Sequence, residues 1–83
     1  MYAIEWASRA LKQLKRLPRA DQARIVAAVR ELRGWPDCRN VLRLSGRDGY
    51  RLRVGRYRVL FDAQDRLRII WVEEVKKRDE HTY

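Results

Sequence analysis

Apolar residues in the first eighteen positions recur first at every second position and then at helical spacing, which predicts a strand followed by a helix. Tyr2, Ile4 and Trp6 alternate with two other residues, which is the period of a short strand. Apolar residues then recur at helical spacing, with Ser8 before them as the expected N-cap: Ala10, Leu11, Leu14 and Leu17. Pro18 ends this helix because proline lacks an N–H donor and disfavours the helical state before it.

A second helical repeat follows the proline directly. It is expected to begin at Arg19 or Ala20 and to end at Arg33, with Gly34 as its C-terminal cap. The apolar stripe of this helix consists of Ile25, Val26, Val29 and Leu32. Because the break at the proline is short, the two helices are expected to form an antiparallel pair.

Beyond residue 34 the apolar period falls to two, which predicts strands. After a loop over 35–40, a short extended segment is expected from Val41, followed by a turn over 45–49. Residues 50–54 and 56–61 alternate on either side of Gly55, and 67–72 are apolar on both faces except at Arg68, as in a buried strand. The order predicts an α+β fold: a strand, a helix pair, then three or four antiparallel strands in a twisted sheet with helices on one face.

Length and composition predict one small domain that spans residues 1–83. The mass is 10.0 kDa, with 46% hydrophobic and 37% charged residues, as is typical of a compact domain. The longest apolar run covers only residues 25–29, whereas a membrane span needs about 20 residues. The first residues lack the basic and apolar regions of a signal peptide, so we expect a cytoplasmic protein. The single cysteine cannot form an internal disulfide.

Positive charge is the first functional clue. Twenty Lys and Arg residues stand against eleven Asp and Glu, which gives a net charge of +9 and a pI near 10.6. Such a field favours polyanionic partners such as nucleic acid or an acidic protein. Arginine predominates and binds phosphate well, although a GC-rich genome would produce the same bias. The stretch with the highest density of positive charge contains one acid, Asp48, and six cations: Arg43, Arg47, Arg51, Arg53, Arg56 and Arg58.

A hairpin with its tip at residues 54–55 would gather four arginines on one face of the sheet. In that register Arg53 lies opposite Arg56 and Arg51 opposite Arg58, because cross-strand partners share a face. The other face of the hairpin, toward the helices, would then carry Tyr50, Leu52, Tyr57 and Val59. Since like charges opposite one another are destabilising, phosphate binding is the reason that we favour for this pattern. A solvated polar face is the alternative.

Other chemistry-bearing residues give weaker signals. His81 has an ordinary pKa of about 6.5 that suits acid–base work, but residues this close to a terminus are often idle. Glu73 and Glu74 would make an acid–base pair only if neighbouring strand residues shared a face, which they do not. Cys38 has no base beside it in the sequence and is expected to be inert. We expect no metal ion and no other cofactor, because one His and one Cys cannot build a zinc site.

In this order and at this length, the pattern resembles the RelE/ParE superfamily, the toxins of bacterial toxin–antitoxin systems. The similarity spans essentially the whole chain and is strongest over residues 49–61, Gly-Tyr-Arg-Leu-Arg-Val-Gly-Arg-Tyr-Arg-Val-Leu-Phe. The helix pair broken at Pro18 and the ending over 75–83 support it. The resemblance implies a compact sheet on two N-terminal helices. We favour the RelE branch, which implies a ribosome-dependent mRNA endoribonuclease; the ParE branch implies a non-enzymatic inhibitor of DNA gyrase.

The resemblance also implies roles for individual residues. The RelE-type reaction is an attack by a ribose 2′-OH on its own 3′ phosphate, which gives a cyclic phosphate and a 5′-OH. The matching catalytic residues are Arg51, Arg53, Arg58, Lys77 (or Arg78 in its place) and Tyr83, the suspected general base. RelE-type enzymes often carry lysine at the two strand positions, and arginine releases a proton reluctantly, so Arg53 is expected to stabilise charge. Further RNA contacts are expected from Arg43, Arg47, Arg56, Lys76 and Arg78.

The expected partners are a cognate antitoxin and mRNA on the ribosome, with no membrane and no small-molecule cofactor. The antitoxin is expected to be acidic in its toxin-binding segment, to cover the arginine face and to fold as it binds. Two alternatives stay open besides the nuclease. One is the gyrase inhibitor, and the other is an inactive relative that survives as a binding module.

Overall fold

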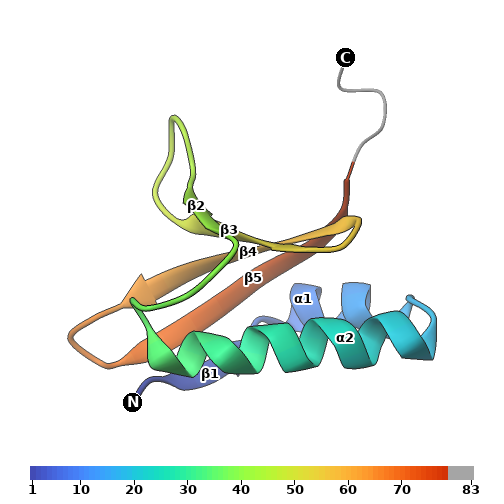
Figure 1. The fold of residues 1–83 in the computed structure, drawn as a ribbon, viewed down its shortest axis with the longest axis horizontal. Coiled ribbons are helices and arrows are strands. Elements are labelled where there is room, and N and C mark those ends of the chain that lie inside the picture. Colours follow the sequence, from blue (N-terminus) through green and yellow to red (C-terminus); the bar gives the residue numbers. More distant parts are fainter. Residues whose placement is uncertain (79–83) are drawn as a thin grey trace.

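The computed structural model describes residues 1–78 and places two helices on one face of a five-stranded sheet (Figure 1). The N-terminal elements are β1 (Ala3–Trp6), α1 (Ser8–Lys15), α2 (Arg19–Arg30) and the 3-10 turn η1 (Glu31–Gly34). The strands that follow are β2 (Val41–Arg43), β3 (Tyr50–Val54), β4 (Tyr57–Gln64) and β5 (Ile69–Lys77). This arrangement confirms the predicted α+β fold. Within the described residues, no helix is long and apolar enough to cross a membrane.

The sheet has the strand order β1-β5-β4-β3-β2. Strands β2 to β5 form the predicted antiparallel meander, and β1 joins its far side by pairing parallel to β5. Helices α1 and α2 run in opposite directions beneath the sheet (Figure 1). Among residues 1–78, the other face of the sheet therefore carries no helix.

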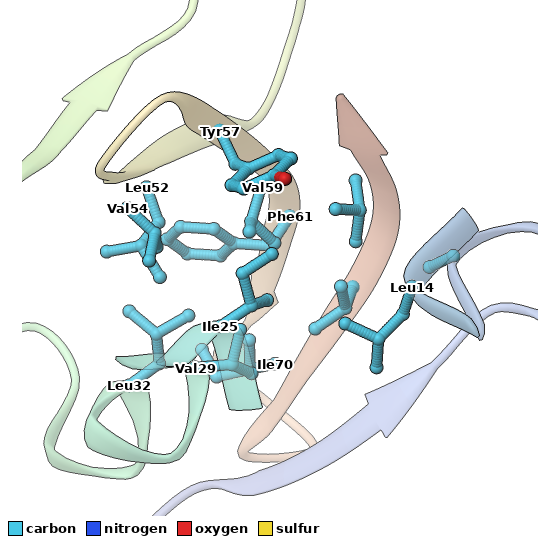
Figure 2. Packing of buried hydrophobic residues seen from close by; sticks show 13 residues of the cluster. Leu14, Ile25, Val29, Leu32, Leu52, Val54, Tyr57, Val59, Phe61 and Ile70 are labelled. Atoms are coloured by element: carbon cyan, nitrogen blue, oxygen red, sulfur yellow. The ribbon is translucent and has the colours of Figure 1, made fainter. Parts of the chain in front are cut away.

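The hydrophobic core lies between the sheet and the helices (Figure 2). Val59 and Phe61 of β4 are fully buried together with Ile25 and Val29 of α2. Burial of such side chains supplies most of the driving force for folding. Because successive residues of a strand point to opposite faces, burial of Val59 turns its neighbour Arg58 to the face without helices.

Three aromatic rings tie the loop after η1 to the middle of the sheet. The Phe61 ring stacks on Tyr50 with 5.6 Å between centroids. The ring of Trp35 meets Tyr50 at 4.7 Å and Phe61 at 5.4 Å, both edge to face. These are favoured geometries for aromatic pairs, so the trio anchors this loop against β3 and β4.

Helix α1 supports the half of β5 that β1 does not reach. The pairing of β1 ends where Trp6 meets Val72. Beyond this point the Gln13 side chain on α1 accepts a hydrogen bond from the Val75 N–H at 2.7 Å. An unpaired N–H at this partly buried edge would be costly, so Gln13 takes the place of a missing strand.

Three boundaries differ from the predicted ones. Ser8 is the first residue of α1 and not its cap, because the Ala7 N–H still bonds to β5, at the Val72 oxygen. The second helix ends at Arg30, and residues 31–34 tighten into η1, whose Arg33 oxygen accepts the Tyr2 N–H at 3.0 Å. The last strand continues to residue 77, because a bulge at residue 73 lets it follow β4 past the apolar run.

The β3–β4 hairpin turns at Gly55 and Arg56, so the predicted pairing of Arg53 with Arg56 is wrong. Arg53 lies opposite Arg58 instead, and Val54 opposite Tyr57. Gly55 has a φ of +56°, which the first position of a type II′ turn requires and which a valine at the tip would resist. The register shift is even, so the faces are unchanged and only Arg56 leaves the predicted set.

Substituting alanine for Gly55 tests this turn. The φ of +56° costs an L-residue about 1–2 kcal/mol, so G55A is expected to lower the free energy of unfolding by about that amount. Gly34 is the matched control, because an added Cβ there meets nothing within 4 Å and its φ lies outside the left-handed region. G34A should stay within about 0.5 kcal/mol of wild type in urea unfolding. Equal effects of the two substitutions would contradict the assigned turn.

Two substitutions at Gln13 test the support of β5. Q13L removes the acceptor of the Val75 N–H and is expected to cost about 1–3 kcal/mol. Q13E keeps an acceptor oxygen in a side chain of the same length and should cost clearly less. Urea unfolding of the three proteins measures both values. If Q13E is as destabilised as Q13L, the hydrogen bond is not what holds this strand.

Candidate nucleic-acid interface

Three cations lie side by side across the helix-free face of the sheet. Arg58 on β4 is flanked by its direct cross-strand partners, Arg53 on β3 and Lys76 on β5. We call these three residues the cation row. Adjacent strands lie about 4.8 Å apart, so the row spans about 10 Å at the backbone. Like charges in such positions repel one another, and an anion bound over the row would relieve that repulsion.

Arg58 occupies the centre of the row and has an unmet donor. Its Nε atom is buried and has no acceptor among residues 1–78. Buried donors are nearly always paired in folded proteins, so an unmet one marks a place for an external acceptor. A phosphate oxygen is a suitable acceptor, because guanidinium groups bind phosphates through parallel hydrogen bonds.

Arg51 lies on the same face, one step further along β3. Its cross-strand neighbours are Leu60 on β4 and Leu42 on β2, and the Arg51 side chain is half-buried. The structure therefore brings Arg51, Arg53 and Arg58 together on one face, as the sequence predicted. Arg51 stands beside the cation row and extends the positive surface toward β2.

Acidic residues border the row on β5. Glu74 shares the face of Lys76 and forms ion pairs with Lys76 at 3.8 Å and with Arg9 of α1 at 3.6 Å. Glu73, at the bulge, pairs with Arg47 of the β2–β3 loop at 3.6 Å. The basic partners are about half exposed or more, so these pairs are weak and the cations remain open to exchange partners. Periodicity in the sequence could not have revealed the ion pair of Arg9 with Glu74, because the two residues lie far apart in the sequence.

The remaining predicted residues divide into two groups. Arg56 and Arg78 lie at the same end of the sheet as the row, where the Arg78 N–H donates to the Arg56 oxygen and the β3–β4 turn meets the end of β5 (Figure 1). Lys77 lies directly across the strands from Tyr57, and Arg43 lies across from Tyr50. Because cross-strand partners share a face, both cations occupy positions on the helix-facing side. The register thus puts Lys76, and not Lys77, beside Arg58. Tyr83 and His81 lie outside the described residues.

The described tyrosines with hydrogen-bonded hydroxyls and the cysteine are all poorly suited to act as bases. The Tyr57 hydroxyl donates to Asp21 at 2.6 Å, and this bond raises the pKa of Tyr57 above its ordinary value. The Tyr2 hydroxyl donates to Asp65 at 2.8 Å, with the same effect on its pKa. Burial raises the pKa of the Cys38 thiol. Near neutral pH these groups stay protonated and are not available as proton acceptors.

The whole architecture matches known toxins. The chain superposes on a toxin in the RelBE2 complex of Mycobacterium tuberculosis with a TM-score of 0.82 and 25% identity, over 93% of this chain and 98% of the other. A chain of the archaeal RelE–RelB complex from Pyrococcus horikoshii OT3 gives a TM-score of 0.79 and 27% identity, over 95% and 97%. The isolated E. coli RelE toxin shares the fold, with a TM-score of 0.83 and 21% identity over 99% and 89%.

Sequence comparison gives the family. No curated protein sequence matches this chain. The model of the family described as "ParE toxin of type II toxin-antitoxin system, parDE" matches residues 4–82, which is nearly the full length. The chain therefore belongs to the ParE toxin family and is a toxin of a type II toxin–antitoxin system with the RelE/ParE fold.

Proposed function

We propose that this toxin is a ribosome-dependent endoribonuclease whose cation row binds the phosphate at which mRNA is cut. The observation that carries the proposal is the row itself, three mutually repelling cations in which the buried Nε of Arg58 has no acceptor among residues 1–78. Nothing in the packing of the core requires cations at these three positions. RNA phosphate supplies both the negative charge and the acceptor that the row lacks.

The proposed reaction forms a bond from the ribose 2′ oxygen to its own 3′ phosphorus and breaks the bond from that phosphorus to the 5′ oxygen. Negative charge grows on the phosphorane oxygens, where the guanidinium groups of Arg53 and Arg58 stabilise it. The proton of the 2′-OH passes to a base, for which we propose Tyr83 on the strength of the family resemblance. A tyrosine has an ordinary pKa of about 10, so it acts as a base near neutral pH only where neighbouring cations lower that pKa.

We propose that Lys76 is the general acid, which donates a proton to the departing 5′ oxygen. A lysine ammonium has an ordinary pKa of about 10.4, whereas a guanidinium releases its proton only above about 12. Lys76 is therefore the one residue of the cation row suited to donate a proton. Its ion pair with Glu74 would hold the ammonium beside Arg58 before RNA arrives.

The solved relatives also suggest how the toxin is controlled. The M. tuberculosis and P. horikoshii structures are toxin–antitoxin complexes, so we propose that a cognate antitoxin neutralises this chain as well. Its site of action would be the cytoplasm, where mRNA is translated.

The family match favours one other function, inhibition of DNA gyrase without nuclease chemistry. In that case the cation row would be a surface for gyrase or its DNA, and proton transfer at Lys76 would have no role. The two functions differ in whether new RNA ends appear and in what a lysine-to-arginine change does.

Three variants at the end of β5 test the proposed proton donor. In primer-extension assays of mRNA on purified ribosomes, K76A is expected to lower the cleavage rate by about 100-fold or more. K76R keeps the charge but not the readily released proton, so RNA affinity should stay near wild type while the rate falls. K77A tests the assignment from resemblance, since it would show the larger loss if Lys77 held this role. A wild-type rate in K76R would sink the proton-donor assignment.

A double substitution in the row tests whether its guanidinium groups stabilise the charge that develops in the reaction. R53A/R58A is expected to abolish growth arrest and to reduce ribosomal mRNA cleavage by at least about 100-fold, because both charge-stabilising groups are gone. R19A/R24A on the exposed side of α2 is the matched control and should remain toxic. Circular dichroism and urea unfolding confirm that each protein is folded. A folded R53A/R58A protein that stays fully toxic would contradict the nuclease.

A further inference from the structure

The helix-free face of the sheet carries a tryptophan that the proposed reaction does not use. Trp71 of β5 lies between Ile70 and Val72, which are both fully buried on the core side. Because successive residues of a strand point to opposite faces, the Trp71 indole is directed to the helix-free face. Within residues 1–78 it is partly exposed and is not one of the side chains that pack on the core. Core packing therefore does not explain so large an aromatic side chain at this position.

Trp71 shares two strands of this face with the cation row. Its direct cross-strand partner on β4 is Asp62, four positions beyond Arg58. At a rise of about 3.4 Å per residue, Arg58 and Asp62 are about 14 Å apart along the strand. Leu60 lies between them on the same face. The indole and the row are thus the two ends of one continuous surface on β4 and β5.

Carboxylates flank the indole on both sides. The cross-strand partners of Trp71 are Asp62 on β4 and Glu5 on β1. Neither carboxylate forms an ion pair within residues 1–78. Their negative charge disfavours a phosphate over the indole. The uncharged, flat part of a nucleotide is its base, and a base fits an aromatic surface that has acids beside it.

The carboxylates also discriminate among the bases. A carboxylate only accepts hydrogen bonds, so it favours a base edge with an exocyclic amine, such as that of cytosine. Uracil presents an oxygen acceptor at the same place, which a carboxylate repels. Asp62 is better placed than Glu5 for this contact, because Asp62 is half-buried on the strand of Arg58, whereas Glu5 is exposed on β1. A hydrogen bond is electrostatically stronger where water is partly excluded.

We propose that Trp71 stacks a base of the RNA whose phosphate lies on the cation row, and that Asp62 selects a base with an exocyclic amine. Aromatic stacking suits single-stranded RNA, whose bases are unpaired. Trp71 is a positioning residue, because it holds the strand without touching the reacting atoms. The inference deepens the proposed nuclease and rests on RNA as its ligand, but binding at this subsite requires no bond to break.

Fluorescence anisotropy at low salt, with labelled runs of cytidine and of uridine of equal length, tests the subsite. Wild-type toxin is expected to bind the cytidine RNA at least about 5-fold more tightly. W71L should weaken binding of both RNAs at least about 5-fold, whereas W71F keeps an aromatic ring and should stay within about 3-fold of wild type. The control L67A shortens an exposed apolar side chain in the β4–β5 turn and should bind like wild type. Wild-type affinity in W71L, or no binding of either RNA by the wild type, would overturn the proposal.

Matched amide substitutions on the two sides of the indole test the base selection. D62N and E5Q each remove one negative charge, so a general gain in RNA affinity is common to both. D62N introduces a donor beside the acceptor and should abolish the preference for cytidine, whereas E5Q should keep it. A preference that survives in D62N, or that is lost equally in E5Q, would overturn the role of Asp62. Urea unfolding checks that each variant is folded, and this pair of variants decides the matter if W71L unfolds.

The subsite and the nuclease can fail separately. Binding that depends on Trp71, without new mRNA ends in cells, would mean that the proposed reaction is wrong and the subsite correct. Ribosomal cleavage that depends on the cation row, with an unchanged rate and unchanged bases around the cuts in W71L, would mean the reverse.

Discussion

The burial of Val59 and Phe61, on the middle strand β4, between the sheet and the helices is the constraint on which the rest of the structure depends. Successive residues of a strand face opposite sides, so Arg58, which precedes Val59, must face the side without helices. The pairing of β4 with both neighbours then sets Arg53 and Lys76 beside it. The cation row is thus built on paired strands over the buried core, and precise placement of a phosphate requires such support.

Positively charged side chains lie on two surfaces of the molecule, on opposite sides of the sheet. The cation row presents repelling charges over a face that carries no helix, which suits a ligand that arrives and leaves. On the helix side, the groove between β1 and α2 is lined by Arg30 and Arg33 beside apolar side chains.

Periodicity predicted much of this structure, and its failures have identifiable causes. The helix pair, the meander and the shared face of Arg51, Arg53 and Arg58 followed from spacing alone. The predicted last strand ends too early, at residue 72, because Val72 and Val75 both face the core although they are three positions apart. A bulge permits this spacing, whereas a strict period of two does not. That bulge also decides that Lys76 rather than Lys77 stands beside Arg58. Contacts such as Arg9 with Glu74, and the groove itself, join distant segments and leave no local signal.

The central claim is that the cation row cuts translated mRNA, and mapping RNA ends in living cells tests it most directly. After a brief induction of the wild-type toxin, new mRNA 5′ ends are sequenced with and without a block of translation. The account predicts new 5′-OH ends inside translated regions, in phase with codons and absent when translation is blocked. Growth arrest with intact mRNA and damaged chromosomes would contradict it and assign the row to gyrase inhibition.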